Sequence, residues 1–266
     1  MTFRTLEISD PSLESEHLRF ITVKSTYLGG RGDICLFVPE NAEGKELPLI
    51  TLLHGVYGSC WSWAFKGAAH FTAHQLISGG RITPMIIAMP SDGLWGDGSG
   101  YFPHVQHNYE QWIVKDVPQA VSAACLDGKL PNKHFICGLS MGGFGALRLG
   151  IKHQDLFSGI SAHSSITNLE QMSEFIEEPL DQFRISNKQE SSVWGTIESK
   201  NGCIPPLRFD CGKEDQLIEA NRKLHQQLSE SKIDHVYTEF PGGHEWEYWQ
   251  SHLAESLLFF DKLIGS

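Results

Sequence analysis

The sequence lacks the features that mark membrane proteins and nucleic-acid-binding proteins. No apolar stretch in its 266 residues approaches the roughly 20 residues needed to span a bilayer. Positive charge is also scarce, because 21 Lys and Arg stand against 32 Asp and Glu, which gives a net charge of −11. Since nucleic-acid binding needs a basic surface, this balance argues against it. We therefore expect neither a membrane partner nor a nucleic-acid partner.

Targeting and redox signals are equally sparse. Residues 1–10 lack a basic region followed by an apolar core, so no secretory signal is visible. The six cysteines are scattered, and no two of them form a Cys-x-x-Cys pair. A chain of this length can bury a large core and needs no disulfides for stability. We expect reduced thiols in a cytoplasmic protein with one domain over residues 1–266.

The strongest chemical signal present is residues 135–145. A short apolar run stops at Gly138, turns through Ser140 and continues into a helical pattern from Ala146. This is Gly-x-Ser-x-Gly in a strand–turn–helix setting, which presents a serine hydroxyl above a sheet on a strained turn. The residues two before and two after the serine come so close that side chains would clash. We interpret Ser140 as a nucleophile, the alternative being a glycine-rich turn with an incidental serine.

Strand patterns and helix patterns alternate along the chain. Near-continuous apolar runs, such as residues 47–53 and 85–90, are typical of strands covered on both faces. The alternation predicts an α/β fold with a mainly parallel sheet and helices on both faces. We expect one helix over residues 61–77 and another with Asp116 as a candidate N-cap. Residues 164–205 break the alternation and indicate either a cap-like insertion or a helix with a solvated acidic face.

Two further candidate residues follow later strands, where active groups of α/β sheets lie. Asp215 comes near the end of one strand, and His244 follows the last strand after two glycines. The chain order Ser, Asp, His is that of the α/β hydrolases. In that arrangement His244 takes the serine proton, and Asp215 fixes the imidazole tautomer and stabilises the imidazolium. Asp210 and Glu214 lie nearby and are the rivals of Asp215.

Two backbone amides are candidates for binding an oxyanion. Met141 opens the helix after Ser140, so its N–H has no partner within the helix. Val56 follows the strand that ends near residue 53. Its N–H therefore lies just beyond a strand end, as that of Met141 does. Aromatic residues in the loops supply candidates for stacking on a substrate ring. They are Tyr57, Trp61, Trp95 and Tyr101.

At these residues the chain resembles the esterase D-like family of α/β hydrolases. This family includes S-formylglutathione hydrolases, feruloyl and acetyl-xylan esterases, short-chain carboxylesterases and mycolyltransferases. The resemblance implies the α/β-hydrolase fold, Ser140, Asp215 and His244 as a catalytic triad, and Val56 and Met141 as oxyanion amides. The matching segments are Leu-Leu-His-Gly at 52–55, Pro-Ser-Asp-Gly at 90–93, Gly-Leu-Ser-Met-Gly-Gly at 138–143, Cys-Gly-Lys-Glu-Asp at 211–215 and Gly-Gly-His-Glu-Trp-Glu-Tyr-Trp at 242–249.

The predicted function is a serine carboxylesterase that hydrolyses short-chain acyl esters, such as acetyl esters, of small alcohols or sugars through an acyl-enzyme. The alternative enzyme is a thioesterase of the S-formylglutathione hydrolase type. Its oxyanion loop usually carries Leu-Thr-Cys, whereas residues 54–59 here read His-Gly-Val-Tyr-Gly-Ser. A relative that only binds a ligand is a third reading, but it would be marked by a lost triad member, and none is lost.

Neither a metal nor a cofactor is implied by these residues. His70 and His74 lie one helical turn apart, which is the spacing of metal ligands, but no third ligand is evident. Serine, histidine and water are sufficient for ester hydrolysis. The expected partner is a small-molecule ester, and the sequence leaves the oligomeric state open, with a homodimer as one option.

Overall fold

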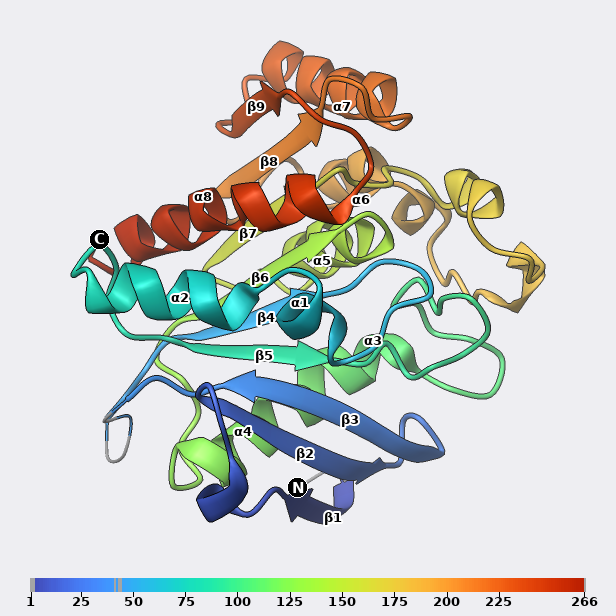
Figure 1. Cartoon of the computed structure of the whole chain (residues 1–266). Coiled ribbons are helices and arrows are strands. Elements are labelled where there is room, and N and C mark those ends of the chain that lie inside the picture. Colours follow the sequence, from blue (N-terminus) through green and yellow to red (C-terminus); the bar gives the residue numbers. More distant parts are fainter. Residues whose placement is uncertain (1–2, 41, 43–44, 266) are drawn as a thin grey trace.

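A nine-stranded sheet is the centre of the computed structural model, which describes residues 3–40, 42 and 45–265 (Figure 1). The strand order is β1-β2-β3-β5-β4-β6-β7-β8-β9. The pairs β1–β2, β2–β3 and β3–β5 are antiparallel, and every later pair is parallel. This topology confirms the predicted α/β architecture. The strands are β1 (Phe3–Ile8), β2 (Leu18–Ser25), β3 (Gly30–Phe37), β4 (Leu49–Leu53), β5 (Ile86–Pro90), β6 (His134–Leu139), β7 (Gly159–His163), β8 (Leu207–Gly212) and β9 (Val236–Phe240).

Helices cover both faces of this sheet (Figure 1). The first, second and last α-helices share one apolar core with alternate residues of the central strands, and the helices before and after β6 share the other. In β4, for example, Leu49 and Leu53 face one core, while Ile50 and Leu52 face the other. None of the helices in the described ranges combines the length and apolar composition that crossing a bilayer requires. The main helices are α1 (Ser62–Phe65), α2 (Ala69–Ser78), α4 (Val117–Cys125), α5 (Met141–Lys152), α6 (Val193–Ser199), α7 (Ile218–Glu230) and α8 (Trp246–Ile264).

The single helix expected over residues 61–77 is two helices. The first ends at Phe65, and Ala68, the N-cap of the second, has a φ of 50°, a left-handed conformation that separates the two helices. The first of the two is held in place by Trp63, whose indole N–H donates to the carbonyl of Leu53 at 2.8 Å. This hydrogen bond joins Trp63 to the end of β4, ten positions earlier. Helix propensity depends on neighbouring residues and does not reveal such a contact.

The helix before β6 begins earlier than expected. Asn108 is its N-cap, because its side chain accepts the N–H of Gln111 at 2.9 Å. Asp116 is not a cap: it lies inside a continuous helix, and its backbone is helical. The Asp-x-Pro pattern is typical of a helix start, but here a widened turn precedes Pro118 and accommodates its missing N–H. The earlier pieces are α3 (Tyr109–Gln111) and the π-helical turn η2 (Trp112–Asp116).

The segment between β7 and β8 leaves the sheet on the side toward which the parallel strands point (Figure 1). Met172 and Ile176 are buried in the core, whereas Glu170 and Glu174 are exposed. The two interpretations of this segment are therefore compatible, since its apolar side packs inward and its acidic side is solvated. Its short 3₁₀ helices are η3 (Leu169–Glu174), η4 (Leu180–Gln182) and η5 (Lys188–Ser191).

Backbone and side-chain hydrogen bonds tie this segment to the loops after β4 and β5. The hydroxyl of Tyr57 donates to the carbonyl of Phe175 at 2.7 Å. The carboxylate of Asp97 accepts the N–H of Glu177 at 2.9 Å, and the N–H of Asp97 donates to the carboxylate of Glu178 at 3.1 Å. Three loops from different parts of the chain thus meet at one place.

His134 in β6 makes the stability of this fold depend on pH. Its Nε2 lies 2.9 Å from the hydroxyl of Thr51, and burial lowers the pKa of the imidazole to about 3. In the unfolded chain the pKa returns to about 6.5, so the unfolded state binds a proton that the folded state excludes. The free energy of unfolding therefore falls with decreasing pH between these two values, by about 1.4 kcal/mol per pH unit from this residue.

We expect His134→Gln, which keeps an acceptor for Thr51, to flatten this dependence. Urea unfolding at several pH values between 6 and 4.5 measures the slope. The variant should lose about 1.4 kcal/mol per pH unit of that slope relative to the wild type. An unchanged slope in the folded variant would show that His134 is protonated in the native protein.

Candidate active site

Ser140 lies on a strained turn between β6 and α5. Its φ of 54° and ψ of −120° are values that side chains rarely adopt outside sites that require them. The N–H of Ser140 donates to the carbonyl of His163 at 3.0 Å, and its carbonyl accepts the N–H of Phe144 at 3.0 Å. The backbone of the turn is thereby fixed to β7 on one side and to the helix on the other. Fixed in this way, the turn has the nucleophile-elbow geometry that the sequence predicts.

The two glycines of the motif are required by close backbone contacts. A Cβ on Gly138 would lie 2.2 Å from the carbonyl oxygen of Gly142. A Cβ on Gly142 would lie 2.4 Å from the carbonyl oxygen of Leu53 and 2.5 Å from that of His54. Because backbone atoms obstruct both positions, neither can accept a side chain without moving a strand or the turn.

We expect Gly142→Ala to lower both stability and any ester hydrolysis. Overpacking of this kind costs about 1–3 kcal/mol in the free energy of unfolding, and a shifted turn moves Ser140 away from its neighbours. Gly30→Ala is the matched control, because a Cβ there would have its nearest neighbour 3.8 Å away. Urea unfolding and ester turnover measured on both variants test this. Equal stability of the two would contradict it.

The structure brings Ser140, His244 and Asp215 together. Nε2 of His244 lies 3.0 Å from Oγ of Ser140, and Nδ1 of the same ring lies 2.9 Å from Oδ2 of Asp215. A carboxylate only accepts hydrogen bonds, so Nδ1 carries the proton and Nε2 is free to accept the serine proton. The Asp215 side chain is fully buried and that of His244 is 20% exposed. This is the geometry of a nucleophile, a base and an orienting acid.

The surroundings of Asp215 favour its charged form, which is the form that an acid orienting His244 requires. Burial alone would raise the pKa of its carboxyl, but the hydrogen bond and charge of His244 and the N–H of Leu217 hold the pKa below its usual value. The Leu217 N–H donates to Oδ1 of Asp215 at 2.8 Å. Asp215 is therefore ionised at neutral pH and presents a negative charge to the imidazole.

The two rival acids make other contacts. Glu214 accepts the N–H of Gly242 at 2.6 Å, on the outside of the loop that carries His244. Asp210 is fully buried and forms ion pairs with Arg208 at 2.6 Å and with His163 at 2.9 Å. Burial would raise the pKa of the Asp210 carboxyl, but these two partners lower it to about 2. Of the three acids, Asp215 is the one that lies within hydrogen-bonding distance of His244.

The N–H groups of Val56 and Met141 border the same site. Within the described residues, neither donates to a backbone or side-chain acceptor. Gly98 lies over both residues, since a Cβ there would be 2.4 Å from the sulfur of Met141 and 3.4 Å from the Val56 side chain. Two unused donors beside a serine hydroxyl are the elements of an oxyanion hole.

Buried residues that the sequence reasoning gave no role hold the Val56 loop in place. Nδ1 of His54 lies 2.7 Å from the carbonyl of Gly55, and the N–H of Asp92 donates to Nε2 of His54 at 3.1 Å. Because a carbonyl only accepts and an N–H only donates, His54 is the neutral tautomer with its proton on Nδ1. Both residues lie in segments that carry the family resemblance, at 52–55 and 90–93, and that resemblance is the signal that could have revealed them.

A cavity of about 560 Å³ opens above Ser140. Phe175 covers part of it and lies against the His244 ring, with the ring centroids 5.6 Å apart. Trp249 packs edge-on against the same ring, with the ring centroids 5.0 Å apart. The other residues that line the cavity include Val56, Tyr57, Ser62, Lys66, Glu245, Trp246 and Glu247.

Of the aromatic residues predicted to contact substrate, one lines the cavity and the others do not. Tyr57 lines the cavity and is 71% exposed. Trp61 lies outside the cavity lining but near it, with the Lys66 ammonium 6.0 Å from its ring. Trp95 packs edge-on against His104 at 4.4 Å and is not part of the lining.

The expectation for Tyr101 needs correction. Its side chain is fully buried, and its hydroxyl donates to the carbonyl of His54 at 2.9 Å. Tyr101 therefore supports the loop that carries Val56 and does not reach a ligand. Trp246 and Trp249, which were not among the predicted site residues, line the cavity and also pack in the core beneath α8.

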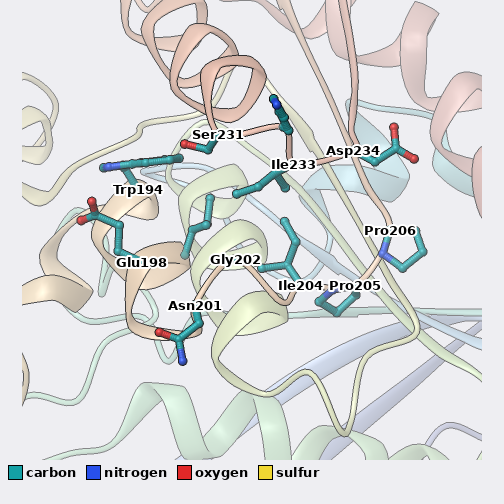
Figure 2. A pocket seen from close by; sticks show the side chains of 12 residues that line it. Trp194, Glu198, Asn201, Gly202, Ile204, Pro205, Pro206, Ser231, Ile233 and Asp234 are labelled. Carbon is teal, nitrogen blue, oxygen red and sulfur yellow. The ribbon is translucent and has the colours of Figure 1, made fainter.

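A second cavity of about 740 Å³ lies between α6 and the loop that joins α7 to β9 (Figure 2). Figure 2 shows Trp194, Ile204 and Ile233 on its walls. None of the predicted site residues lines it, and its lining contains no serine–histidine pair. In the part of the chain that the structure describes, no group of three or more His, Cys, Asp or Glu side chains is arranged to hold a metal ion.

A parallel sheet with a strained serine turn at a strand end defines the class of the α/β hydrolases. A family model described as "Putative esterase" matches residues 25–260. The chain therefore belongs to the esterase family of hydrolases, as its motifs predicted.

Two curated relatives are similar to this chain over most of its length. An acetyl esterase of Caldicellulosiruptor saccharolyticus is 25% identical over 248 residues, which cover 84% of this chain and 87% of that protein. An esterase of Mycobacterium tuberculosis is 25% identical in an alignment that covers 90% of this chain and 58% of that longer protein. The chain thus spans most of the first relative and little more than half of the second.

Solved structures of several esterases share the fold. A ferulic acid esterase superposes with a TM-score of 0.78 at 23% identity, over 98% of this chain and 99% of that one. An S-formylglutathione hydrolase from Agrobacterium tumefaciens superposes with a TM-score of 0.76 at 16% identity, over 98% and 99% of the two chains. At these identities the superpositions establish the α/β-hydrolase fold alone.

Proposed function

We propose that the chain is a serine carboxylesterase that hydrolyses short-chain acyl esters of small alcohols or sugars through an acyl-enzyme. The observation that carries the proposal is the His244 imidazole, which lies 3.0 Å from Oγ of Ser140 and 2.9 Å from Oδ2 of Asp215 at the floor of a cavity. The similarity to an acetyl esterase over 84% of the chain supports a small acyl group.

The reaction follows from the positions of these atoms. Oγ of Ser140 attacks the acyl carbon while Nε2 of His244 takes the hydroxyl proton. The carbonyl oxygen becomes negative, and the N–H groups of Val56 and Met141 stabilise it, each by about 3–4 kcal/mol in comparable sites. His244 then gives the proton to the alcohol oxygen, which leaves. Water repeats the sequence on the acyl-enzyme and releases the acid and Ser140.

The segment between β7 and β8 acts in this proposal as a fixed cap over the acyl-enzyme. The Phe175 ring lies tilted against the His244 ring, and the carbonyl of Phe175 accepts the hydroxyl of Tyr57 in the oxyanion loop. Excluding water from one side of the ring strengthens the electrostatic contacts beneath it. The residues of this segment would therefore influence which acyl and alcohol groups fit.

Turnover of p-nitrophenyl acetate, butyrate and octanoate, with S-formylglutathione in parallel, tests the assignment. We expect acetate to be hydrolysed with the highest kcat/KM of the oxygen esters, and the thioester to be a poorer substrate. Strong preference for the thioester would assign the chain to the alternative function, an S-formylglutathione hydrolase. No turnover of any ester by the folded protein would contradict both.

A further inference from the structure

A buried polar cluster lies next to the candidate triad and takes no part in the chemistry proposed above. His163 ends β7, and its Nδ1 lies 2.9 Å from Oδ2 of Asp210 in β8. Its Nε2 lies 2.8 Å from the hydroxyl of Ser256 in α8. Arg208 forms an ion pair with Asp210 at 2.6 Å, and its guanidinium reaches the hydroxyl of Ser256 at 3.3 Å. The cluster therefore joins two strands and the last helix.

The order of contacts in this cluster repeats that of a catalytic triad, with Ser256, His163 and Asp210 in place of serine, histidine and acid. All three are completely buried, so no substrate reaches them. Burial alone would lower the pKa of His163, but the carboxylate of Asp210 raises it to about 9. An imidazole that holds its proton at neutral pH does not serve as a general base. The cluster is thus not a second active site.

Two members of the candidate triad depend directly on strands that the cluster joins. The carbonyl of His163 accepts the N–H of Ser140 at 3.0 Å. The carbonyl of Asp210 accepts the N–H of Ser164 at 2.8 Å, which binds the ends of β7 and β8 together. Asp215 follows Asp210 on the same chain segment, in the turn after β8. A shift of either strand end would move the nucleophile relative to the acid.

The third member, His244, is linked to the cluster through Tyr248. His244 precedes α8, and the Tyr248 hydroxyl in the first turn of that helix donates to Oδ1 of Asp210 at 2.8 Å. The Tyr248 ring also packs against Gly242, where a Cβ would lie 2.9 Å from the ring and where φ is +121°. Tyr248 therefore contacts the loop that carries His244 and the buried acid at the same time.

Stability alone is a weak explanation for such a cluster. Removing charges from water is costly, and apolar packing of similar volume often replaces a buried ion pair without loss of stability. Directional hydrogen bonds fix the relative position of the elements that they join, which non-directional apolar packing does to a lesser degree. The cluster therefore fixes the positions of β7, β8 and α8 relative to one another.

We propose that the cluster positions the triad, and that the hydrogen bond from Tyr248 to Asp210 holds His244 within reach of Ser140. This inference rests on the proposed serine-esterase function. Tyr248 and Asp210 are positioning residues, because they act through the His244 loop and through the strand ends. A misplacement of about 1 Å at a catalytic group can cost about a hundredfold in rate.

Tyr248→Phe tests the proposal, because it removes the hydroxyl and keeps the ring against Gly242. We expect kcat for p-nitrophenyl acetate to fall about 10- to 100-fold, with KM changed less than about threefold, because the cavity is intact and only the approach of His244 is altered. Tyr237→Phe is the matched control. It also removes a hydroxyl bonded to a carboxylate, that of Glu239 at 3.0 Å, but in β9 and outside this cluster. The control should keep the wild-type kcat and KM.

Thermal unfolding of both variants separates a folding defect from a positioning defect. If Tyr248→Phe does not fold, Ser256→Ala tests the other end of the cluster, where we expect a several-fold fall in kcat at unchanged KM. A folded Tyr248→Phe with wild-type kcat would overturn the proposal. So would an unfolded Tyr248→Phe together with a wild-type kcat in Ser256→Ala. In both cases an inactive Ser140→Ala would leave the esterase function standing, whereas a wild type that hydrolyses no ester would remove the function itself.

Discussion

Ser140→Ala is expected to lower kcat for p-nitrophenyl acetate by about 10⁴- to 10⁶-fold. The variant retains the cavity and the Val56 and Met141 amides, so the remaining rate is that of water attacking a bound ester. Because the removed hydroxyl forms the covalent intermediate, both halves of the reaction are lost together. Steady-state kinetics with a long time course measure the remaining rate.

Ser122→Ala is the control for this substitution, because it removes a serine hydroxyl from α4, on the sheet face opposite α8. We expect it to hydrolyse the ester at the wild-type rate. A Ser140→Ala variant that retains wild-type kcat would show that another group is the nucleophile, and the interpretation of the strained turn would be wrong.

Asp215→Asn is expected to lower kcat by roughly 10⁴-fold without unfolding the protein. The amide has the same shape, but it presents an N–H₂ group to Nδ1 of His244 in place of an acceptor. The imidazole then adopts the wrong tautomer, with the proton on Nε2, and is no longer able to accept the proton of Ser140. Steady-state kinetics measure the loss, and circular dichroism checks that the fold is retained.

Glu214→Gln separates Asp215 from its rival on the same loop. Its side-chain oxygen would still accept the N–H of Gly242, as the Glu214 carboxylate does at 2.6 Å. We expect this variant to retain most of the wild-type kcat. If Glu214→Gln is inactive and Asp215→Asn is active, the orienting acid has been assigned to the wrong residue.

Chain order and strand position were sufficient to predict the architecture and the three side chains that meet. Ser140, Asp215 and His244 each follow a strand of the parallel part of the sheet, and the carboxyl ends of such strands lie at one edge. Asp215 was preferred over Asp210 because Asp210 lies within the strand, where its side chain is buried in the sheet. Asp215 comes five positions later, in the loop after the strand. Their roles in catalysis stay predictions until the substitutions are made.

Contacts between distant segments account for what the sequence did not reveal. Tyr101 was expected in the site because its loop is rich in glycine and aromatic residues, yet its hydroxyl reaches His54, 47 positions earlier. Asp116 has the local pattern of an N-cap, but the helix had already begun at Tyr109. Trp246 and Trp249 were not predicted in the site, because only the position of α8 against the loops shows that its first turn borders the cavity.

The most direct test of the central claim is the mass of the protein during turnover. Rapid acid quenching of the wild type mixed with p-nitrophenyl acetate, followed by intact mass measurement and peptide mapping, detects an acyl-enzyme. We predict one acetyl group per chain, on the peptide that contains Ser140, and none on the Ser140→Ala variant. An acetyl group on a different residue, or turnover that proceeds with no adduct at any time, would contradict the account.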